Sequence, residues 1–542
     1  MFASVFLAVV ALLAVVLGVV IWVNNKPETK SLPDSQSNNT ASSGTKRTVK
    51  KAAKEQENKN ELENINEQRD VTPSSTPSGG KPSEKQVVPD KEKKSKNKSP
   101  FLTFDELVQN SKAFEQNYKE FLVKDNTVEA IIGRFPVDQQ AAKRKFVEEQ
   151  AANVRIIADA RTVQLAADFL AHKQQHGSPQ EKQVYEGMSL DAFVNRLFLK
   201  RPLTFYCSDD KTVLRDKEHQ KESVRNAAWR KVGTPQEVQP LVLQNYLSYE
   251  EIEIAALFSI SVPTFFINDG NRYNEGELDT TGNFLQEGIY VGAVGARFEI
   301  LDLMESRRML IQKNPPSKTP FDAAWNELYN VSEPRPQYQE ILKTKDPQYI
   351  KAIGKDVFLD AAAFRVRLAL SFRPFILHGQ REGERLNRKV ILRLVGLGTG
   401  CWAIHTSAQN HAIYDVVKKV VADNGLPNIS LIEFMWISVH PSVPSTGDEQ
   451  SGDAFLQDRA GENIPVLFHK GNPADPRPEG KEEHVVMAMY AWDGNSFPGN
   501  EYWDGSHAGS GDPAAACCST IQELQNPYIN TQLEAPGRLV AY

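Results

Sequence analysis

The sequence predicts an α/β fold in which a sheet flanked by helices follows a helical N-terminal layer. Residues 101–176 carry apolar side chains at helical spacings, with Leu107 and Phe114 on the same expected face. Beyond Ser259 the chain changes to short apolar runs that alternate with glycine-rich turns. Residues 390–439 contain a strand, a tight turn, a helix and a second strand in that order, which is the pattern of an α/β sheet.

Six short apolar runs are expected to form the strands of this sheet. They are Pro263–Ile267, Gly288–Val294, Val390–Val395, Leu431–Val439, Pro465–His469 and Val485–Ala491. The third and fourth runs are joined by a glycine-rich turn and by a helix expected from Trp402 to Asn424, which ends before Gly425. A strand, a helix and a strand in succession predict two parallel strands with a right-handed crossover.

The chain is expected to divide into a transmembrane anchor at residues 1–23, a disordered linker at 24–100, a helical region at 101–258 and an α/β domain at 259–542. Residues 2–23 contain no charged side chain, and at about 1.5 Å per residue such a helix crosses a bilayer core of about 30 Å. A signal peptide would begin with basic residues, which this segment lacks. The first lysines follow the apolar run, which predicts a single-pass membrane protein with its catalytic part in the cytoplasm.

The composition of the linker and of the remaining chain limits the partners. Residues 24–100 contain no aromatic residue and are rich in Lys, Ser, Asn and Pro, so they cannot bury enough apolar surface to fold. Because basic residues outnumber acidic ones there, residues 101–542 are more acidic than the formal net charge of −6 for the whole chain. An acidic body does not attract the phosphate backbone, so we expect no nucleic acid partner.

A glycine-rich turn, GLGTG at residues 396–400, follows the third expected strand. Glycines allow the backbone to approach a ligand closely, and unpaired N–H groups at the start of a helix favour an anion such as phosphate. We therefore assign to ligand binding Gly396, Gly398, Thr399 and Gly400. The turn lacks the lysine of a P-loop, and a dinucleotide fingerprint would need glycine in place of Cys401. A methyltransferase pattern and a simple tight turn remain as alternatives.

Four carboxylates lie in residues 491–518, a segment too rich in glycine to form one helix. They are Asp493, Glu501, Asp504 and Asp512. If strand 485–491 runs parallel to strand 390–395, Asp493 and the glycine-rich turn emerge at the same edge of the sheet, where α/β proteins bind ligands. Two carboxylates suit cleavage of a glycosidic bond, because one stabilises the developing positive charge or activates water and the other protonates the leaving group.

These residues also have simple structural interpretations. Residues 493–495 fit a turn, and Asp512 fits the N-terminal cap of the next helix. A calcium loop does not fit, because Phe497 and Pro498 occupy positions that need a ligand and a glycine. The histidines show no metal-ligand spacing, so we expect no metal and no cofactor.

The segment 491–530, together with GARFE at 295–299 and the turn at 396–400, resembles a family of macrodomain-like ADP-ribosyl hydrolases. This family is related to a bacterial effector that removes ADP-ribose from an arginine of ubiquitin. The resemblance implies a macrodomain-like mixed sheet, binding of ADP-ribose, and hydrolysis through three acidic residues. By position these are Asp493, Glu501 and Asp512, with Asp504 as the competitor of Glu501.

The residues and the resemblance together predict a membrane-anchored ADP-ribosyl hydrolase that acts on modified protein side chains. The resemblance favours an arginine linkage and implies ubiquitin as a partner. In the expected site residues 396–400 hold the pyrophosphate, Asp493 and Glu501 polarise water or the leaving guanidinium, and Asp512 binds the distal ribose or orients its neighbours. The other expected ligand contacts are Trp492, Asn495 and Asp504. The alternatives are a reader that binds ADP-ribose without cleaving it and an S-adenosylmethionine-dependent methyltransferase.

Overall fold

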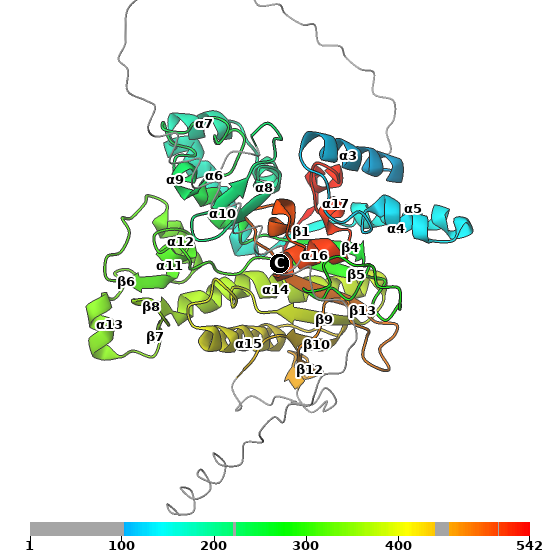
Figure 1. Ribbon diagram of the computed structural model, residues 1–542. Helices are drawn as coiled ribbons and strands as arrows, with labels where there is room; N and C mark the ends of the chain where they lie inside the picture. The colour runs from blue at the N-terminus through cyan, green and yellow to red at the C-terminus, as the bar shows by residue number, and fades with distance from the viewer. Residues whose placement is uncertain (1–101, 220–223, 440–454, 508) are drawn as a thin grey trace, which may run out of the picture. The chain divides into compact units, whose positions relative to one another are not determined.

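A mixed sheet of nine strands, flanked by helices, runs through the part of the chain that the structure describes (Figure 1). The computed structural model describes residues 102–219, 224–439, 455–507 and 509–542. In spatial order the strands are β11 (Phe455–Gln457), β12 (Asn463–His469), β10 (Ile429–Met435), β9 (Val390–Val395), β13 (Val485–Ala491), β5 (Glu287–Ala293), β4 (Ser259–Phe265), β1 (Arg155–Ala158) and β14 (Leu539–Ala541). The predicted α/β fold with helices around a sheet is confirmed.

The centre of the sheet is parallel. β12, β10, β9, β13 and β5 run in the same direction, and β4 then pairs antiparallel with both β5 and β1. β9 and β13 are buried along nearly their whole length, which explains why the sequence shows them as continuous apolar runs. All six predicted strands are present, although those predicted at 263–267 and 431–439 begin earlier and end at Phe265 and Met435.

The predicted parallel crossover between β9 and β10 is confirmed, but its helix begins later than predicted. α15 spans Thr406–Asp423 and does not start at Trp402. The residues directly before α15 form a turn instead. In this turn the backbone N–H groups of Ile404 and His405 donate to the side-chain oxygen of Gln409 at 2.9 Å each. α14 (Ala361–Leu386) packs against α15 and against β9 and β1.

The N-terminal part of the described chain is mostly helical and also contributes to the sheet. Its helices are α3 (Phe104–Asn117), α4 (Val128–Arg134), α5 (Val137–Ala152), α6 (Ala160–His176), α7 (Pro179–Tyr185), α8 (Leu190–Leu199), α9 (Asn226–Trp229) and α10 (Tyr249–Ala255). β1 lies in this part and pairs with β4 and with β14. A hairpin of β2 (Thr204–Tyr206) and β3 (Lys211–Val213) precedes α9.

The remaining elements surround the sheet or follow its last central strand. They are α11 (Glu305–Met309), β6 (Leu310–Gln312), α12 (Asp322–Leu328), α13 (Tyr338–Thr344), β7 (Tyr349–Lys351), β8 (Val357–Asp360), η1 (Asn500–Asp504), α16 (Gly511–Cys518), α17 (Ile521–Leu524) and η2 (Thr531–Glu534). β6, β8 and β7 form a small separate sheet. Of the acidic residues that follow β13, Asp493 lies in the loop, Glu501 and Asp504 lie in η1, and Asp512 lies in α16.

The prediction of a single-pass membrane protein is corrected by the structure. Within residues 102–219, 224–439, 455–507 and 509–542, no helix combines the length and the apolar character that crossing a membrane requires. The anchor predicted at residues 1–23 lies outside the described residues.

A buried ion pair joins α14 to the loop that follows β5. Arg367 Nε lies 3.1 Å from Glu305 Oε1, and the two side chains are 1% and 0% exposed. The same guanidinium donates to the carbonyl oxygens of Ala256 and Val294 at 3.1 Å each. The other carboxylate oxygen of Glu305 accepts the N–H of Arg297 at 3.3 Å. Arg367 of α14 thus contacts the loop after β5 at its start, through Val294, and at its end, through Glu305.

Loss of the Arg367 guanidinium should strongly destabilise the fold. Arg367→Ala leaves Glu305 buried without its cation, which typically costs about 3–5 kcal/mol. The matched control is Arg365→Ala on the same helix, because Arg365 pairs with Asp415 at the surface, where an ion pair contributes at most about 1 kcal/mol. Urea unfolding measures both variants, and equal losses of stability would contradict the assigned role.

Glu523 links the C-terminal segment to the N-terminal helices from a buried position. It lies in α17, is 1% exposed, and accepts hydrogen bonds from the Ser111 hydroxyl and the Val128 N–H. Burial raises the pKa of Glu523 to about 7. The folded chain therefore favours the protonated form of this carboxyl up to neutral pH.

Glu523 should make the folded state less stable as pH rises. An unfolded glutamate has a pKa of about 4.3, so between pH 4.3 and about 7 the folded state binds more protons and its stability falls with rising pH. Glu523→Gln removes the charge. The resulting change in the free energy of unfolding should be about 2–4 kcal/mol more stabilising at pH 8 than at pH 4. Urea unfolding at both values tests this, and an effect independent of pH would exclude the assigned titration.

Candidate active site

Three loops meet at the carboxyl ends of the parallel strands β5, β13 and β9. β13 pairs in parallel with β5 as far as Ala491 and Ala293, and with β9 along its first residues. The loop after β5, Asp493 after β13 and the turn at 396–400 after β9 therefore emerge at the same edge of the sheet. The predicted position of Asp493 and the glycine-rich turn at a shared edge is confirmed.

The glycine-rich turn packs against the loop after β5 without space for side chains. A Cβ atom on Gly295 would lie 2.1 Å from the backbone nitrogen of Gly398, and one on Gly398 would lie 2.7 Å from the carbonyl oxygen of Ala296. Gly398 also has a φ of +68°, where a side chain causes strain. The Thr399 hydroxyl donates to the carbonyl of Gly396 at 3.0 Å. Close packing of the two loops is thus one reason for these glycines.

The prediction that this turn lies directly at a helix N-terminus is wrong. α15 begins only at Thr406, because the intervening residues form a turn of their own. Gln409 of α15 reaches back and donates to the carbonyl of Gly398 at 3.1 Å. Gly400 is exposed, so an anion at this end of the turn would meet backbone N–H groups and not the helix dipole.

Asp493 is held in place by an amide that comes from η1. Asn500 Nδ2 donates to Asp493 Oδ2 at 2.7 Å. Asn500 is fully buried, and its own orientation is fixed by β2, where its Oδ1 accepts the N–H of Phe205 at 2.7 Å and its Nδ2 donates to the Phe205 carbonyl at 3.3 Å. Asp493 keeps partial solvent exposure, so a ligand can reach a carboxylate whose position is determined by its neighbours.

The Asp512 carboxylate holds together the loop between Asp493 and Asn500. Its carboxylate accepts the backbone N–H groups of Gly499 at 2.8 Å, Asn500 at 3.1 Å and Asp493 at 3.3 Å. The alternative in which Asp512 caps its own helix is wrong, because α16 begins at Gly511 and Ser510 occupies the cap position. Asp512 is only 2% exposed, so its geometry suits the orientation of neighbours better than contact with a ribose.

Burial of the two neighbouring aspartates changes their titration. Burial, with a smaller contribution from nearby Glu501, raises the pKa of Asp493 to about 7 although the hydrogen bond from Asn500 lowers it. Burial and the neighbouring Asp493 also raise the pKa of Asp512, although its three N–H donors favour the charged form. Two groups this close titrate as a pair, and a carboxylate that changes charge near neutral pH suits proton transfer.

Further charged residues around Asp493 come from the loop after β5. Arg297 is 4% exposed and pairs with Asp210 at 2.6 Å and with Glu299 at 2.8 Å. Both Arg297 and Glu299 act on the pKa of Asp493, so they lie in its surroundings. Glu501 is partly exposed and accepts a hydrogen bond from the Ser510 hydroxyl at 3.0 Å. Sequence reasoning missed Arg297 and Glu299 as site residues, although their position directly after an apolar strand was a usable signal.

Three of the predicted ligand contacts are buried or have partners within the protein. Trp492 is 1% exposed and packs under the Arg201 guanidinium, which lies 4.1 Å from its ring centre. Asn495 is 2% exposed. Asp504 pairs with Lys211 at 2.9 Å and accepts a hydrogen bond from the Tyr206 hydroxyl. Trp492 and Asn495 are therefore less accessible than Asp493 and Glu501, and Asp504 is exposed but paired. Their role in ligand binding stays a prediction.

Comparison of the sequence with known proteins identifies the family of this chain. Residues 117–540 match the family described as ADP-ribosylhydrolase MavL-like. The chain belongs to this family. It is 31% identical to ADP-ribosylarginine hydrolase CG2909 of Drosophila melanogaster over 421 residues, which cover 74% of this chain and 81% of that relative. It is also 31% identical to ADP-ribosylarginine hydrolase CG3568 of the same organism over 408 residues, or 71% and 77% of the two chains.

Membership of the family confirms the resemblance to ADP-ribosyl hydrolases and the prediction of a hydrolase that acts on ADP-ribosylated protein. The match begins at the end of α3 and reaches β14, so it includes the mostly helical region as well as the sheet. It favours the hydrolase over the two alternatives, the non-catalytic reader and the methyltransferase.

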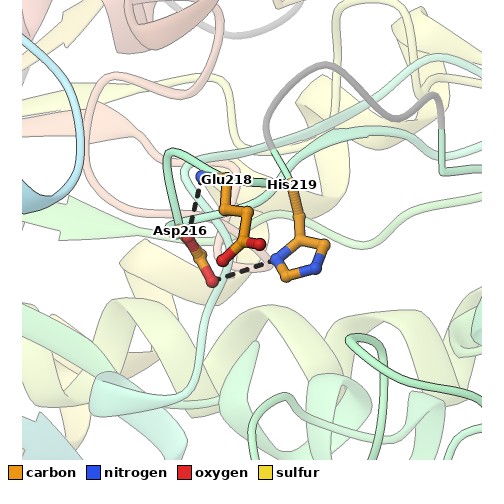
Figure 2. A group of neighbouring side chains, drawn as sticks. All are labelled: Asp216, Glu218 and His219. Atoms are coloured by element: carbon orange, nitrogen blue, oxygen red, sulfur yellow. Dashed lines mark hydrogen bonds and ion pairs between the residues drawn. The ribbon is translucent and has the colours of Figure 1, made fainter.

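Three side chains after β3 are close enough together to hold a metal ion. Asp216, Glu218 and His219 each place one ligand atom within 4.8 Å of the others (Figure 2). Asp216 accepts the N–H of Glu218 at 2.8 Å, and its other oxygen lies 3.0 Å from His219 Nδ1. These are the hydrogen bonds of an ordinary turn around an aspartate, and the two carboxylates are exposed. We assign this group no function.

Asn500 should act as a positioning residue for Asp493. Asn500→Ala is expected to lower kcat for hydrolysis of ADP-ribosylated protein roughly 10–100-fold, because the carboxylate loses its fixed orientation. Since the hydrogen bond opposes the raised pKa of Asp493, its loss should also move the pH–rate profile to higher pH.

Asn530→Ala is the matched control for Asn500→Ala. Asn530 is equally buried, and its amide donates only to the backbone carbonyls of Ala151 and Leu524. This control should lower the melting temperature without moving the pH–rate profile. If both variants leave the profile unchanged, Asn500 has only a structural role.

Proposed function

We propose that this chain hydrolyses the glycosidic bond between ADP-ribose and an arginine side chain of a modified protein. The names of the two Drosophila relatives support the arginine linkage. The observation that carries the proposal is Asp493, a partly exposed carboxylate with a pKa near 7 at the carboxyl ends of parallel strands. We also propose that the mixed sheet is of the macrodomain-like kind that the resemblance implies.

The proposed reaction uses the exposed carboxylates on opposite sides of the bond that breaks. Asp493, when ionised, accepts a proton from the water that attacks the anomeric carbon and stabilises the positive charge that develops there. Glu501 faces the leaving guanidinium, whose positive charge matches the acidic surroundings. The bond between the anomeric carbon and the guanidinium nitrogen breaks, and its electron pair leaves with the nitrogen. Water supplies the new hydroxyl, and the proton taken up by Asp493 passes to the released guanidine.

The remaining residues position the substrate or the loop in this proposal. Asp512 acts through the backbone N–H groups that it binds and so fixes Asp493 and η1. The turn at 396–400, at the same edge of the sheet, borders the pyrophosphate. We assign Trp492 and Asn495 to support of the loop because they are almost fully buried, and Asp504 to the rim because of its pairing with Lys211.

Replacement of Asp493 tests the assignment directly. Asp493→Asn should lower the release of ADP-ribose from arginine-ADP-ribosylated protein by at least about 100-fold, because the general base is lost. Arginine-ADP-ribosylated ubiquitin is one substrate to include. Asp415→Asn is the control, since Asp415 is an exposed partner of Arg365. A variant at Asp493 that is as fast as the parent would overturn the catalytic role.

The pH dependence follows from the titration of the same carboxyl. Burial raises the pKa of Asp493 to about 7, and the ionised form is the active one in the proposed reaction. The rate should therefore rise with pH and level off above an apparent pKa near 7, a value that belongs to the pair with Asp512. Initial rates between pH 5 and pH 9 check this, and a rate that falls across the range would indicate that the protonated form is required.

A further inference from the structure

A second candidate binding site lies at the opposite edge of the central sheet. A cavity of about 180 Å³ is found where β5 and β13 begin, and Gly288, Ile289, Val485 and Val486 line it. Asp493 follows the other end of β13. A strand of seven residues spans about 23 Å, so the cavity is separate from the candidate active site.

Two guanidinium groups at this cavity are fixed side by side by the main chain. Arg388 Nε donates to the carbonyl of Glu483 at 2.6 Å, and Arg477 Nε donates to the next carbonyl, that of His484, also at 2.6 Å. Both arginines line the cavity. Burial lowers the pKa of Arg477, and the positive charge of nearby Arg388 lowers it further. The two guanidinium charges therefore repel each other.

Within the described parts of the chain no carboxylate forms an ion pair with either arginine, although the charges of Glu287 and Glu483 raise the pKa of Arg477 and Glu149 also lines the cavity. Glu287 also lines the cavity, but no ion pair joins it to Arg388 or Arg477 among those residues. The Nε atom of each arginine donates to a backbone carbonyl. The two terminal nitrogens of each guanidinium group therefore remain for another partner. Paired guanidinium forks bind phosphate oxygens with two parallel hydrogen bonds each.

The rest of the cavity is suited to the carbon part of a small ligand. Phe146, Pro263 and Leu386 provide apolar walls. Gln150 is 1% exposed, and both polar atoms of its amide lack a hydrogen-bond partner within the described residues. Burying an amide without a hydrogen-bond partner costs about 1–3 kcal/mol of folding free energy. A protein that keeps such a group in spite of this cost can use it to bind a ligand.

We propose that this cavity binds a small organic phosphate, with the phosphate on Arg388 and Arg477 and the carbon part against Phe146 and Pro263. The volume of about 180 Å³ is below the roughly 300–1,000 Å³ of pockets that enclose drug-sized ligands. A molecule of the size of ADP-ribose is therefore too large. The site is independent of the proposed hydrolysis, because it lies where β5 and β13 begin, whereas Asp493 follows the end of β13.

Titration calorimetry of the full chain with phenyl phosphate tests the proposal. Phenyl phosphate should bind, and it should bind more tightly than inorganic phosphate because the apolar walls contact the ring. The Arg388→Ala, Arg477→Ala double variant should bind at least 10-fold more weakly. Lys389→Ala is the matched control, since it removes a neighbouring charge that does not line the cavity, and it should change the affinity less than 3-fold.

Each result has a defined meaning. No binding by the parent chain, or equal losses from Lys389→Ala and the double variant, would overturn the proposal. Displacement of phenyl phosphate by ADP-ribose, or loss of its binding in Asp493→Asn, would place the ligand in the active site and would also overturn it. If the double variant does not fold, Arg388→Ala alone is measured, because Arg388 is exposed.

Discussion

The buried carboxylate of Asp512 is the contact on which the candidate active site depends. The segment between Asp493 and Asn500 is rich in small and polar residues, and it lies between a strand and a short 3₁₀-helix. One carboxylate accepts backbone N–H groups from both ends of this segment and so takes the place of the hydrogen bonds of regular structure. Only because these ends are joined does the Asn500 amide reach Asp493, and Phe205 of β2 then fixes that amide.

A series of mostly buried charges runs from α14 to the surroundings of Asp493. Arg367 of α14 binds Glu305, which accepts the N–H of Arg297, and the Arg297 side chain binds Asp210 and Glu299. Each of these charged side chains has a partner of opposite charge, so the carboxylates near Asp493 do not disrupt the fold. Under the proposed function the partly exposed Asp493 and Glu501 are the carboxylates left for a positively charged substrate group.

The sequence was sufficient for the central strands and for the acidic loop, and insufficient for the contacts that give the loop its geometry. β9 and β13 are continuous apolar runs, and the shared edge followed on the condition, met in the structure, that the two strands run parallel. The Asn500–Phe205 pair joins residues 295 positions apart, and no local pattern reports such a contact. Trp492 illustrates a related difficulty, because an aromatic residue in a glycine-rich loop has the same local sequence whether it meets a ligand or, as here, the Arg201 guanidinium.

The pairing of β1 with β14 has a consequence for the order in which the chain becomes structured. β1 starts at Arg155, whereas its parallel partner starts at Leu539, so this edge of the sheet stays incomplete until the nearly 400 residues between the two strands have been synthesised. Contacts between residues so far apart slow folding, because a long loop must close before they form. During synthesis one side of β1 therefore presents unpaired backbone groups, a surface that favours association with other chains or with chaperones.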